Sequence, residues 1–242
     1  DALIHKVLLQ NLKPATTYFV QTESTIAGEK LTSKWASFRT GSLPGTPVKF
    51  AVVGDTQDHP EANTIVGKGI YAERPDSIMI VGDLVGMGWN KHQWEHDFFG
   101  SLRPLFDHVP LLPVMGNHDR NARIYYDLMY APAPTNWYRY QTGDVEFFVI
   151  DTNQSVQPNS PQYRWLEEAL KTSTAKWKVA AHHHPPYSSD NDDFGDSDVE
   201  PTTEGELEIR PLTGLYDNYG VDLCFSGHIH AYERTFPMKA GK

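Results

Sequence analysis

From Val48 onwards, nearly continuous apolar runs alternate with stretches of helical pattern. The runs are "VKFAVVGD", "SIMIVGD", "VPLLPVMGNHD", "VEFFVIDTN", "WKVAAHHHP" and "VDLCFSGHIH". The helical stretches cover roughly residues 61–74, 90–103, 121–130, 161–172 and 206–219. Strands that are apolar along their whole length are typically buried on both faces, with helices covering the sheet. The pattern therefore predicts a layered α/β domain over residues 48–242.

Residues 1–43 have a different texture. They contain short β-type runs, "HKVLLQNL", "TTYFVQTEST" and "KWASFRTGS", which polar and Gly-containing turns separate. Short strands at this spacing are typical of β-sandwich domains. The stretch "LPGTP" then marks the change to the α/β pattern. We therefore expect a partial β-sandwich over residues 1–43, ahead of the larger domain.

The charge balance narrows the classes of partner. The chain carries 21 Lys and Arg residues against 31 Asp and Glu residues, a formal net charge of −10. An acidic chain is a poor binder of polyanions, so we expect no nucleic-acid partner. An anionic substrate would need local positive charge, which a bound metal ion supplies. The sequence contains no apolar run of 18 residues or more, and we expect no membrane span.

The chain has a single cysteine, Cys224. This excludes an internal disulfide and a cysteine-rich zinc site. Because Cys224 lies in an apolar run, we expect its thiol to pack in the core.

Polar residues of the kinds that bind metals follow five of the six apolar runs. They are Asp55, Asp83, the group Asn117, His118 and Asp119, the triplet His182, His183 and His184, and the pair His228 and His230. In open α/β sheets, binding sites form outside the carboxyl ends of the strands, so these residues should converge. A glycine precedes the polar residue at positions 54, 82, 116 and 227, where it permits a tight turn out of the strand.

Each of these features alone is weak, because an Asp after a strand is often a turn or cap residue. Their conjunction is more specific. A mixed set of carboxylates, an amide and imidazoles suits Mn, Fe or Zn. At least six ligands are too many for one tetrahedral zinc ion, but they suit two neighbouring metals.

The stretch 188–208 is polar and acidic, and we interpret it as a solvated loop. A calcium loop that begins at Asp190 is an alternative. It has Gly195 at the required place, but Phe194 and Pro201 stand where oxygen ligands are needed.

The blocks "GDTQ", "GDLVGMG", "GNHD", "HHHPPYSS" and "GHIHAYER" occur in this order. From about residue 48 to the end, the chain resembles calcineurin-like metallophosphoesterases, and specifically the purple acid phosphatase branch. Residues 1–43 resemble the end of a fibronectin type III-like domain through "NLKPATTYFVQ" and "SFRTGS". The resemblance implies a four-layer α/β/β/α sandwich. Because the family usually adds strands after the "AYER" block, we expect the chain to be a fragment.

The resemblance also implies a dinuclear centre of Fe, Mn or Zn. Asp55 and His230 would bind the first metal, and Asp83 would bridge both. The second metal would be bound by Asn117, His183 and His228. A metal-bound hydroxide would attack phosphorus. His118 would contact the phosphate and protonate the leaving oxygen, and Asp119 would orient it.

The chain departs from the family pattern at three places. Gly86 stands where the purple enzymes carry a metal-binding tyrosine. The purple colour that iron(III) bound to tyrosinate produces should therefore be absent from this protein. Gln57 stands where other metallophosphoesterases carry a histidine, and its amide oxygen is a candidate ligand. Asp192 and Asp193 stand where plant enzymes carry phosphate-binding histidines. We assign His184 and Tyr187 to the substrate side of the site.

The leading hypothesis is a dinuclear metal-dependent phosphoesterase that hydrolyses small phosphomonoesters. A phosphodiesterase or nucleotide pyrophosphatase on the same site is the second interpretation, because pocket shape distinguishes the two. A non-catalytic extracellular binding module is the third, and the intact ligand set argues against it. A β-sandwich ahead of a hydrolase, without cysteine pairs, favours a secreted or cell-surface (periplasmic) location.

Overall fold

The structure is a computed structural model, which describes residues 4–130, 136–189 and 205–241. The calcium-loop alternative at Asp190 and the expectations for Asp192 and Asp193 lie outside the described residues.

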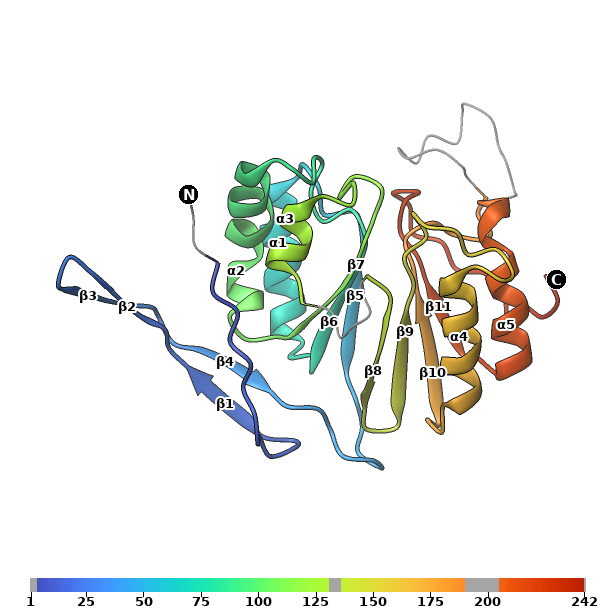
Figure 1. Ribbon diagram of the computed structural model, residues 1–242, viewed down its shortest axis with the longest axis horizontal. Helices are drawn as coiled ribbons and strands as arrows, with labels where there is room; N and C mark the ends of the chain where they lie inside the picture. Colours follow the sequence, from blue (N-terminus) through green and yellow to red (C-terminus); the bar gives the residue numbers. More distant parts are fainter. Residues whose placement is uncertain (1–3, 131–135, 190–204, 242) are drawn as a thin grey trace.

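Two β-sheets form the centre of the larger domain (Figure 1). The first sheet is parallel, in the order β5-β6-β7, and its strands are β5 (Phe50–Val53), β6 (Ser77–Val81) and β7 (Leu111–Val114). The second has the order β11-β10-β9-β8, and its strands are β8 (Tyr138–Thr142), β9 (Val145–Val149), β10 (Trp177–Ala181) and β11 (Leu223–Phe225). Its pairs are parallel except for the β8–β9 hairpin.

Helices cover the outer face of each sheet (Figure 1). The first sheet carries α1 (Pro60–Ala72), a π-helical stretch (Gln93–Gly100), α2 (Ser101–Phe106) and α3 (Arg123–Leu128). The second carries α4 (Pro161–Thr172), a short 3₁₀ turn (Leu207–Ile209) and α5 (Pro211–Tyr219). This arrangement confirms the predicted α/β/β/α sandwich.

Three apolar clusters hold the layers together. One lies between the first sheet and its helices around Trp94 and Phe98, and another between the second sheet and α4 and α5 around Leu166. The third lies between the sheets, where Met79 faces the layer that contains Phe147. Because β6 and β9 contribute to clusters on both of their faces, most of their residues are apolar, which explains their nearly continuous apolar runs. The exception in β9 is Glu146, which is buried and forms an ion pair with Arg139 at 3.3 Å.

The amino-terminal residues form antiparallel pairs. β1 (Thr17–Val20) pairs with β4 (Ala36–Arg39), and β2 (Glu23–Ile26) pairs with β3 (Glu29–Thr32) in a hairpin that projects from the body (Figure 1). The run "HKVLLQNL" does not form a strand, and Val7 and Leu8 in it are exposed. The assignment of residues 1–43 to a β-sandwich stays a prediction.

Two details differ from the expectations. The sequence analysis did not predict strand β8, because the pattern of "YRYQT" is not apolar. Cys224 is exposed rather than in the core, because β11 is the edge strand of its sheet. Its Sγ lies 3.2 Å from Nε2 of His182. Among the described residues, no helix has the length and apolar character that a membrane crossing requires.

Candidate metal centre

The expected ligands come together at the carboxyl ends of β5, β6, β7, β10 and β11. Each follows its strand by two to five residues: Asp55 after β5, Asp83 after β6, Asn117 after β7, His183 after β10, and His228 and His230 after β11. Parallel strands end at the same edge of a sheet, so residues from 55 to 230 share one site.

One group of ligand atoms surrounds the side chain of Asn117. Its Oδ1 lies 2.9 Å from Nε2 of His183 and 3.0 Å from Nδ1 of His228. The same Nε2 of His183 lies 3.2 Å from Oδ2 of Asp83. One amide oxygen, two imidazole nitrogens and one carboxylate oxygen therefore face a common point.

A second group consists of Asp55, Asp83 and His230, whose ligand atoms all lie within 4.8 Å of one another. Nε2 of His230 is 3.6 Å from Oδ1 of Asp55. Asp83 therefore contacts both groups, which is the position of a bridging ligand.

Gln57 lies beside the second group and is buried. Its Nε2 is 3.1 Å from Nε2 of His230 and 3.5 Å from Oδ2 of Asp83. Its Oε1 is buried and has no hydrogen-bond partner among the residues that the structure describes. A buried amide oxygen without a donor is costly, and a cation would satisfy it.

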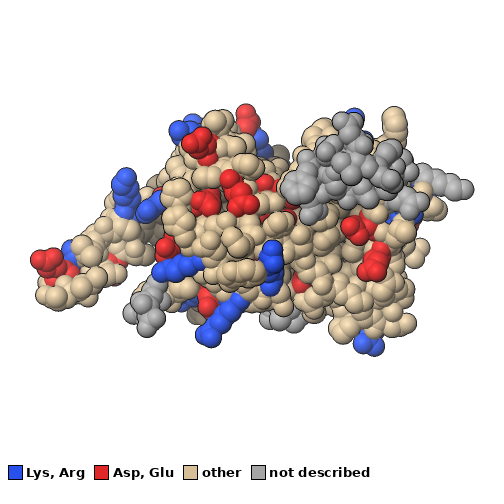
Figure 2. Space-filling model, turned by 90° about the horizontal axis from the view of Figure 1, so that it is seen from above, with Lys and Arg blue, Asp and Glu red and all other residues tan. Residues whose placement is uncertain are grey.

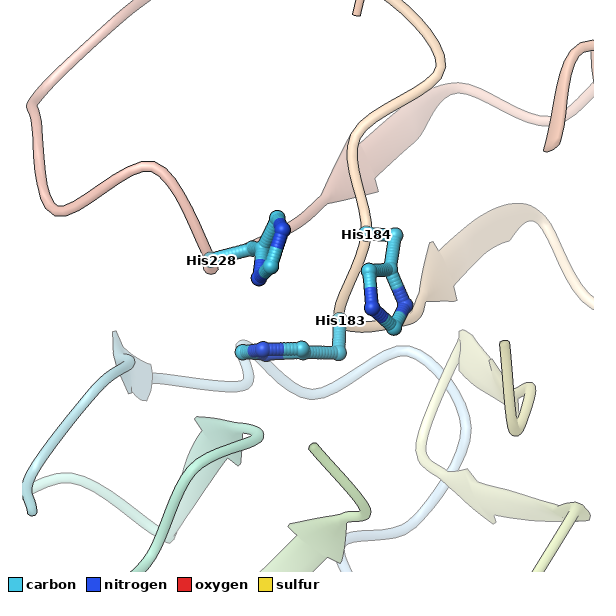
Figure 3. Close-up of side chains that lie close together, drawn as sticks. All are labelled: His183, His184 and His228. Carbon is cyan, nitrogen blue, oxygen red and sulfur yellow. The ribbon is translucent and has the colours of Figure 1, made fainter. Parts of the chain in front are cut away.

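Three imidazoles converge on the Asn117 side of the site (Figure 3). His183 and His184 come from the segment after β10, and His228 comes from the segment after β11. The ring of His184 lies 4.5 Å from that of His228 and 5.0 Å from that of His183. Nδ1 of His184 is 2.7 Å from Oγ1 of Thr152, which also accepts from the His184 amide.

The backbone is strained where it presents the ligands. Asp55, Asp83, His228 and His230 all adopt positive φ angles, between 52° and 76°. Non-glycine residues rarely adopt this conformation, and such strain concentrates at functional sites. Of the four glycines that precede ligands, only Gly82 has a positive φ, 96°. A Cβ at Gly82 would overlap Nδ1 of His183, so the glycine also makes room for a ligand.

The charges of the site are strongly coupled. Burial raises the pKa of Asp55 above its usual value. Burial also acts to raise the pKa of Asp83, but the hydrogen bond and charge of His183 outweigh it and lower that pKa. For His183, burial acts to lower the pKa, yet the carboxylates of Asp83 and Asp55 raise it to about 9. Metal-free, the site therefore holds a proton between His183 and Asp83 that a cation would displace.

His118 extends from the same loop as Asn117. Its Nδ1 lies 3.1 Å from the carbonyl oxygen of Gly86, and its amide donates to Oδ1 of Asp83 at 2.8 Å. The carboxylate of Asp119 accepts from the amides of Leu84 (3.0 Å), Val85 (3.4 Å) and Gly116 (2.8 Å). These bonds hold the segment that leads to Gly86, whose carbonyl contacts the His118 ring. The role of Asp119 in orienting His118 stays a prediction.

Asp58 occupies the space beside Gly86. A Cβ at Gly86 would overlap the Asp58 carboxylate, which accepts from Nε2 of Gln93 at 2.9 Å. An acidic side chain from the loop after β5 therefore occupies the space in which a side chain at position 86 would begin.

An open cavity of about 1960 Å³ adjoins the site and is lined in part by Gln57, His118, Tyr187 and His230. The guanidinium of Arg210 lies 4.8 Å from the ring centre of Tyr187. Figure 2 shows the face onto which the strand ends open, with several Asp and Glu side chains near its middle. Among the described residues, acidic side chains are prominent near the middle of this face, and a bound cation would supply positive charge for an anionic substrate.

Two residues beside the site, Thr152 and Glu206, do not belong to the sequence motifs. Thr152 binds His184, as described above. Glu206 places its Oε1 4.0 Å from Nε2 of His228. Thr152 follows the one apolar run of the six to which no ligand was assigned, and this position at a strand end indicates a residue near the site. Glu206 belongs to an acidic stretch that gives no such indication.

The residues present fit a pair of divalent cations. The donor set combines carboxylate, amide and imidazole atoms, which suits Mn, Fe or Zn. The Gln57 side chain faces the group of Asp55, Asp83 and His230 through Nε2, and a half-turn of its amide would present the orphaned Oε1 as a further oxygen.

The chain is similar to known phosphatases and phosphodiesterases in sequence and in fold. Purple acid phosphatase 15 of Arabidopsis thaliana is 26% identical over 97% of this chain and 50% of its own length. A nucleotide pyrophosphatase/phosphodiesterase of Hordeum vulgare is 27% identical over 67% of the chain and 50% of its own length. The structure of purple acid phosphatase PPD1 from yellow lupin (Lupinus luteus) seeds superposes with a TM-score of 0.80 at 21% identity, covering 96% of this chain and 47% of that one.

The chain thus spans about half the length of these relatives. The family of calcineurin-like phosphoesterases matches residues 48–232, which include every expected ligand. The chain belongs to the calcineurin-like phosphoesterase family.

Proposed function

We propose that the chain is a phosphoesterase that hydrolyses small phosphomonoesters at a centre of two metal ions. The observation that carries this proposal is the position of Asp83 between two ligand groups. Its Oδ2 lies 3.2 Å from Nε2 of His183, and its carboxylate also belongs to the group with Asp55 and His230. Two adjacent cations that share a carboxylate are suited to displacement at phosphorus.

The ligands would form two sets that share Asp83. Asp55, Asp83, His230 and the Gln57 oxygen would hold one cation, and Asp83, Asn117, His183 and His228 the other. Bound cations supply an activated water and offset the charge that builds on the phosphoryl oxygens. His118 lines the adjoining cavity, where its imidazole would contact the phosphate and donate a proton to the leaving oxygen. The Gly86 carbonyl would hold Nδ1 of His118 and leave Nε2 to face the substrate.

A phosphodiesterase or nucleotide pyrophosphatase is the second candidate. The open cavity beside the site supports it, because it leaves room for a second ester group. The Hordeum vulgare relative carries that name. His184 and Tyr187 would then contact the larger leaving group.

The test combines elemental analysis with turnover of p-nitrophenyl phosphate and bis-p-nitrophenyl phosphate, with and without added Mn, Zn or Fe. We expect about two metals per chain and faster monoester turnover, which Asp83→Asn abolishes. Asp107→Asn removes a carboxylate from a surface ion pair with Arg103 and serves as the matched control. Turnover of the diester alone would favour the second candidate. A protein that retains no metal and hydrolyses neither ester would overturn both candidate functions and favour a binding module.

A further inference from the structure

The two ring nitrogens of His228 face different partners. Nδ1 lies 3.0 Å from Oδ1 of Asn117, on the side where the ligand atoms converge. Nε2 lies on the opposite side, 4.0 Å from Oε1 of Glu206. The imidazole is 10% exposed and the Glu206 side chain 44% exposed, so the carboxylate stands between a buried ring and solvent.

The backbone holds Glu206 in this place. Its amide donates to the carbonyl of Pro185 at 2.9 Å, and its own carbonyl accepts from Ile209 at 3.0 Å at the start of the 3₁₀ turn. Gly205, with a φ of 61°, packs so tightly that a Cβ there would lie 2.7 Å from the backbone nitrogen of Tyr187. Glu206 is therefore fastened to the segment that follows the ligand His183.

Metal binding at Nδ1 of His228 determines where the remaining ring proton resides. A neutral imidazole that uses Nδ1 as a ligand carries its proton on Nε2. Metal-binding histidines usually donate that second N–H to a carboxylate or a carbonyl, which fixes the ring and makes it a stronger ligand. His183 already has such a partner, because its Nδ1 is 2.8 Å from the carbonyl oxygen of Val81. For His228, Glu206 is a carboxylate that the described part of the chain places on the corresponding side.

We propose that Glu206 is the outer carboxylate of the His228 ligand and positions that imidazole for the second metal. When Nδ1 binds the cation, Nε2–H donates to Oε1 of Glu206, and the separation of 4.0 Å contracts to hydrogen-bond distance. Glu206 is thus a positioning residue rather than a ligand. The inference rests on the proposed dinuclear site and adds to it a residue outside the motifs.

The test is the binding of Co²⁺ to the metal-free protein, followed by visible absorption and by competition with a chelator. Glu206→Ala removes the acceptor, whereas Glu206→Gln keeps an amide oxygen at the same reach. Glu208→Ala is the matched control, because it removes an exposed carboxylate two residues away on the same segment. Thermal unfolding of the metal-free variants shows whether the substitutions disturb the fold.

We expect Glu206→Ala to weaken the second Co²⁺ by about 10- to 100-fold and to leave the first unchanged. Glu206→Gln should weaken it less, and Glu208→Ala not at all. In the cobalt-loaded parent, proton NMR should show an exchangeable, paramagnetically shifted imidazole N–H that exchanges faster with solvent in Glu206→Ala.

Two results would overturn the proposal while leaving the dinuclear site intact. One is that Glu206→Ala binds each of the two cobalt ions as tightly as Glu208→Ala does. The other is a change in the cobalt absorption of Glu206→Gln that indicates a lost ligand, which would make Glu206 a direct ligand. A parent protein that binds fewer than two cobalt ions would overturn the proposed function itself, together with this inference.

Discussion

The side-chain nitrogen of Gln57 lies 3.1 Å from Nε2 of His230, beside the group that His230 forms with Asp55 and Asp83. The oxygen of the same amide is buried and has no partner among the described residues. A half-turn of the amide exchanges the two atoms and directs the oxygen at the cation position. As a ligand, Gln57 would supply an amide oxygen in place of an imidazole, and an amide oxygen binds Mn, Fe or Zn more weakly.

We therefore expect Gln57→His to strengthen binding of the first metal and Gln57→Leu to weaken it, each by about tenfold. Competition with a chelator, monitored separately for the two metals, measures the change. Gln21→Leu alters an exposed glutamine in the amino-terminal region and should leave both affinities unchanged. If Gln57→Leu behaves like that control, Gln57 is not a ligand.

Gly82→Ala should damage the site through its backbone. A Cβ at this position would overlap the His183 ring, and the φ of 96° disfavours any side chain. We expect a loss of about 1–3 kcal/mol in the free energy of unfolding, together with weaker binding of the second metal. Urea unfolding measures the first quantity and metal titration the second. Gly69→Ala in α1, where nothing lies within 4 Å, should be neutral or stabilising.

Loading the protein with ferric iron should produce no visible tyrosinate band. Gly86 provides no phenol, and the Asp58 carboxylate fills the adjoining space. An absorption spectrum of the iron-loaded chain checks this expectation. Tyr187 lines the adjoining cavity, so Tyr187→Phe is the informative companion variant. A band in the parent that disappears in Tyr187→Phe would contradict the prediction and identify the ligand.

Acid should destabilise the metal-free protein through His182. This residue is fully buried, and burial, together with the charge of His183, lowers its pKa from 6.5 to about 4, although the His184 carbonyl opposes the shift. Below pH 6.5 His182 is protonated in the unfolded chain, whereas in the folded chain it becomes protonated only near pH 4. Stability is therefore lost as the pH falls through this window, by about 3 kcal/mol in total.

Urea unfolding of the metal-free protein between pH 7.5 and 4.5 tests this expectation. His182→Gln should show a shallower loss of stability than the parent. His92→Gln changes an exposed histidine and should follow the parent curve. Parallel curves for the parent and His182→Gln would show that His182 does not contribute to the acid sensitivity.

Several features of the site and of the fold depend on contacts that cannot be read from the sequence. Asp119 belongs to the "GNHD" block, yet its carboxylate binds amides of the loop after β6 rather than the His118 ring. Strand β8 escaped prediction because it pairs along only one side, so its residues need not all be apolar. Cys224 is exposed because of the position of β11 at the sheet edge.

The sequence by itself determined the layered α/β class and the order of the polar residues at the strand ends. Strands buried on both faces are mostly apolar, and this leaves a nearly continuous apolar run in the sequence. Only the tertiary structure decided which atoms meet. Packing between segments far apart in sequence produces three of these contacts. They are the sharing of Asp83 by two groups, the Asp58 carboxylate beside Gly86, and the approach of Glu206 to His228. Local patterns carry no information on such distances, because side-chain contacts across a sheet depend on how the layers pack.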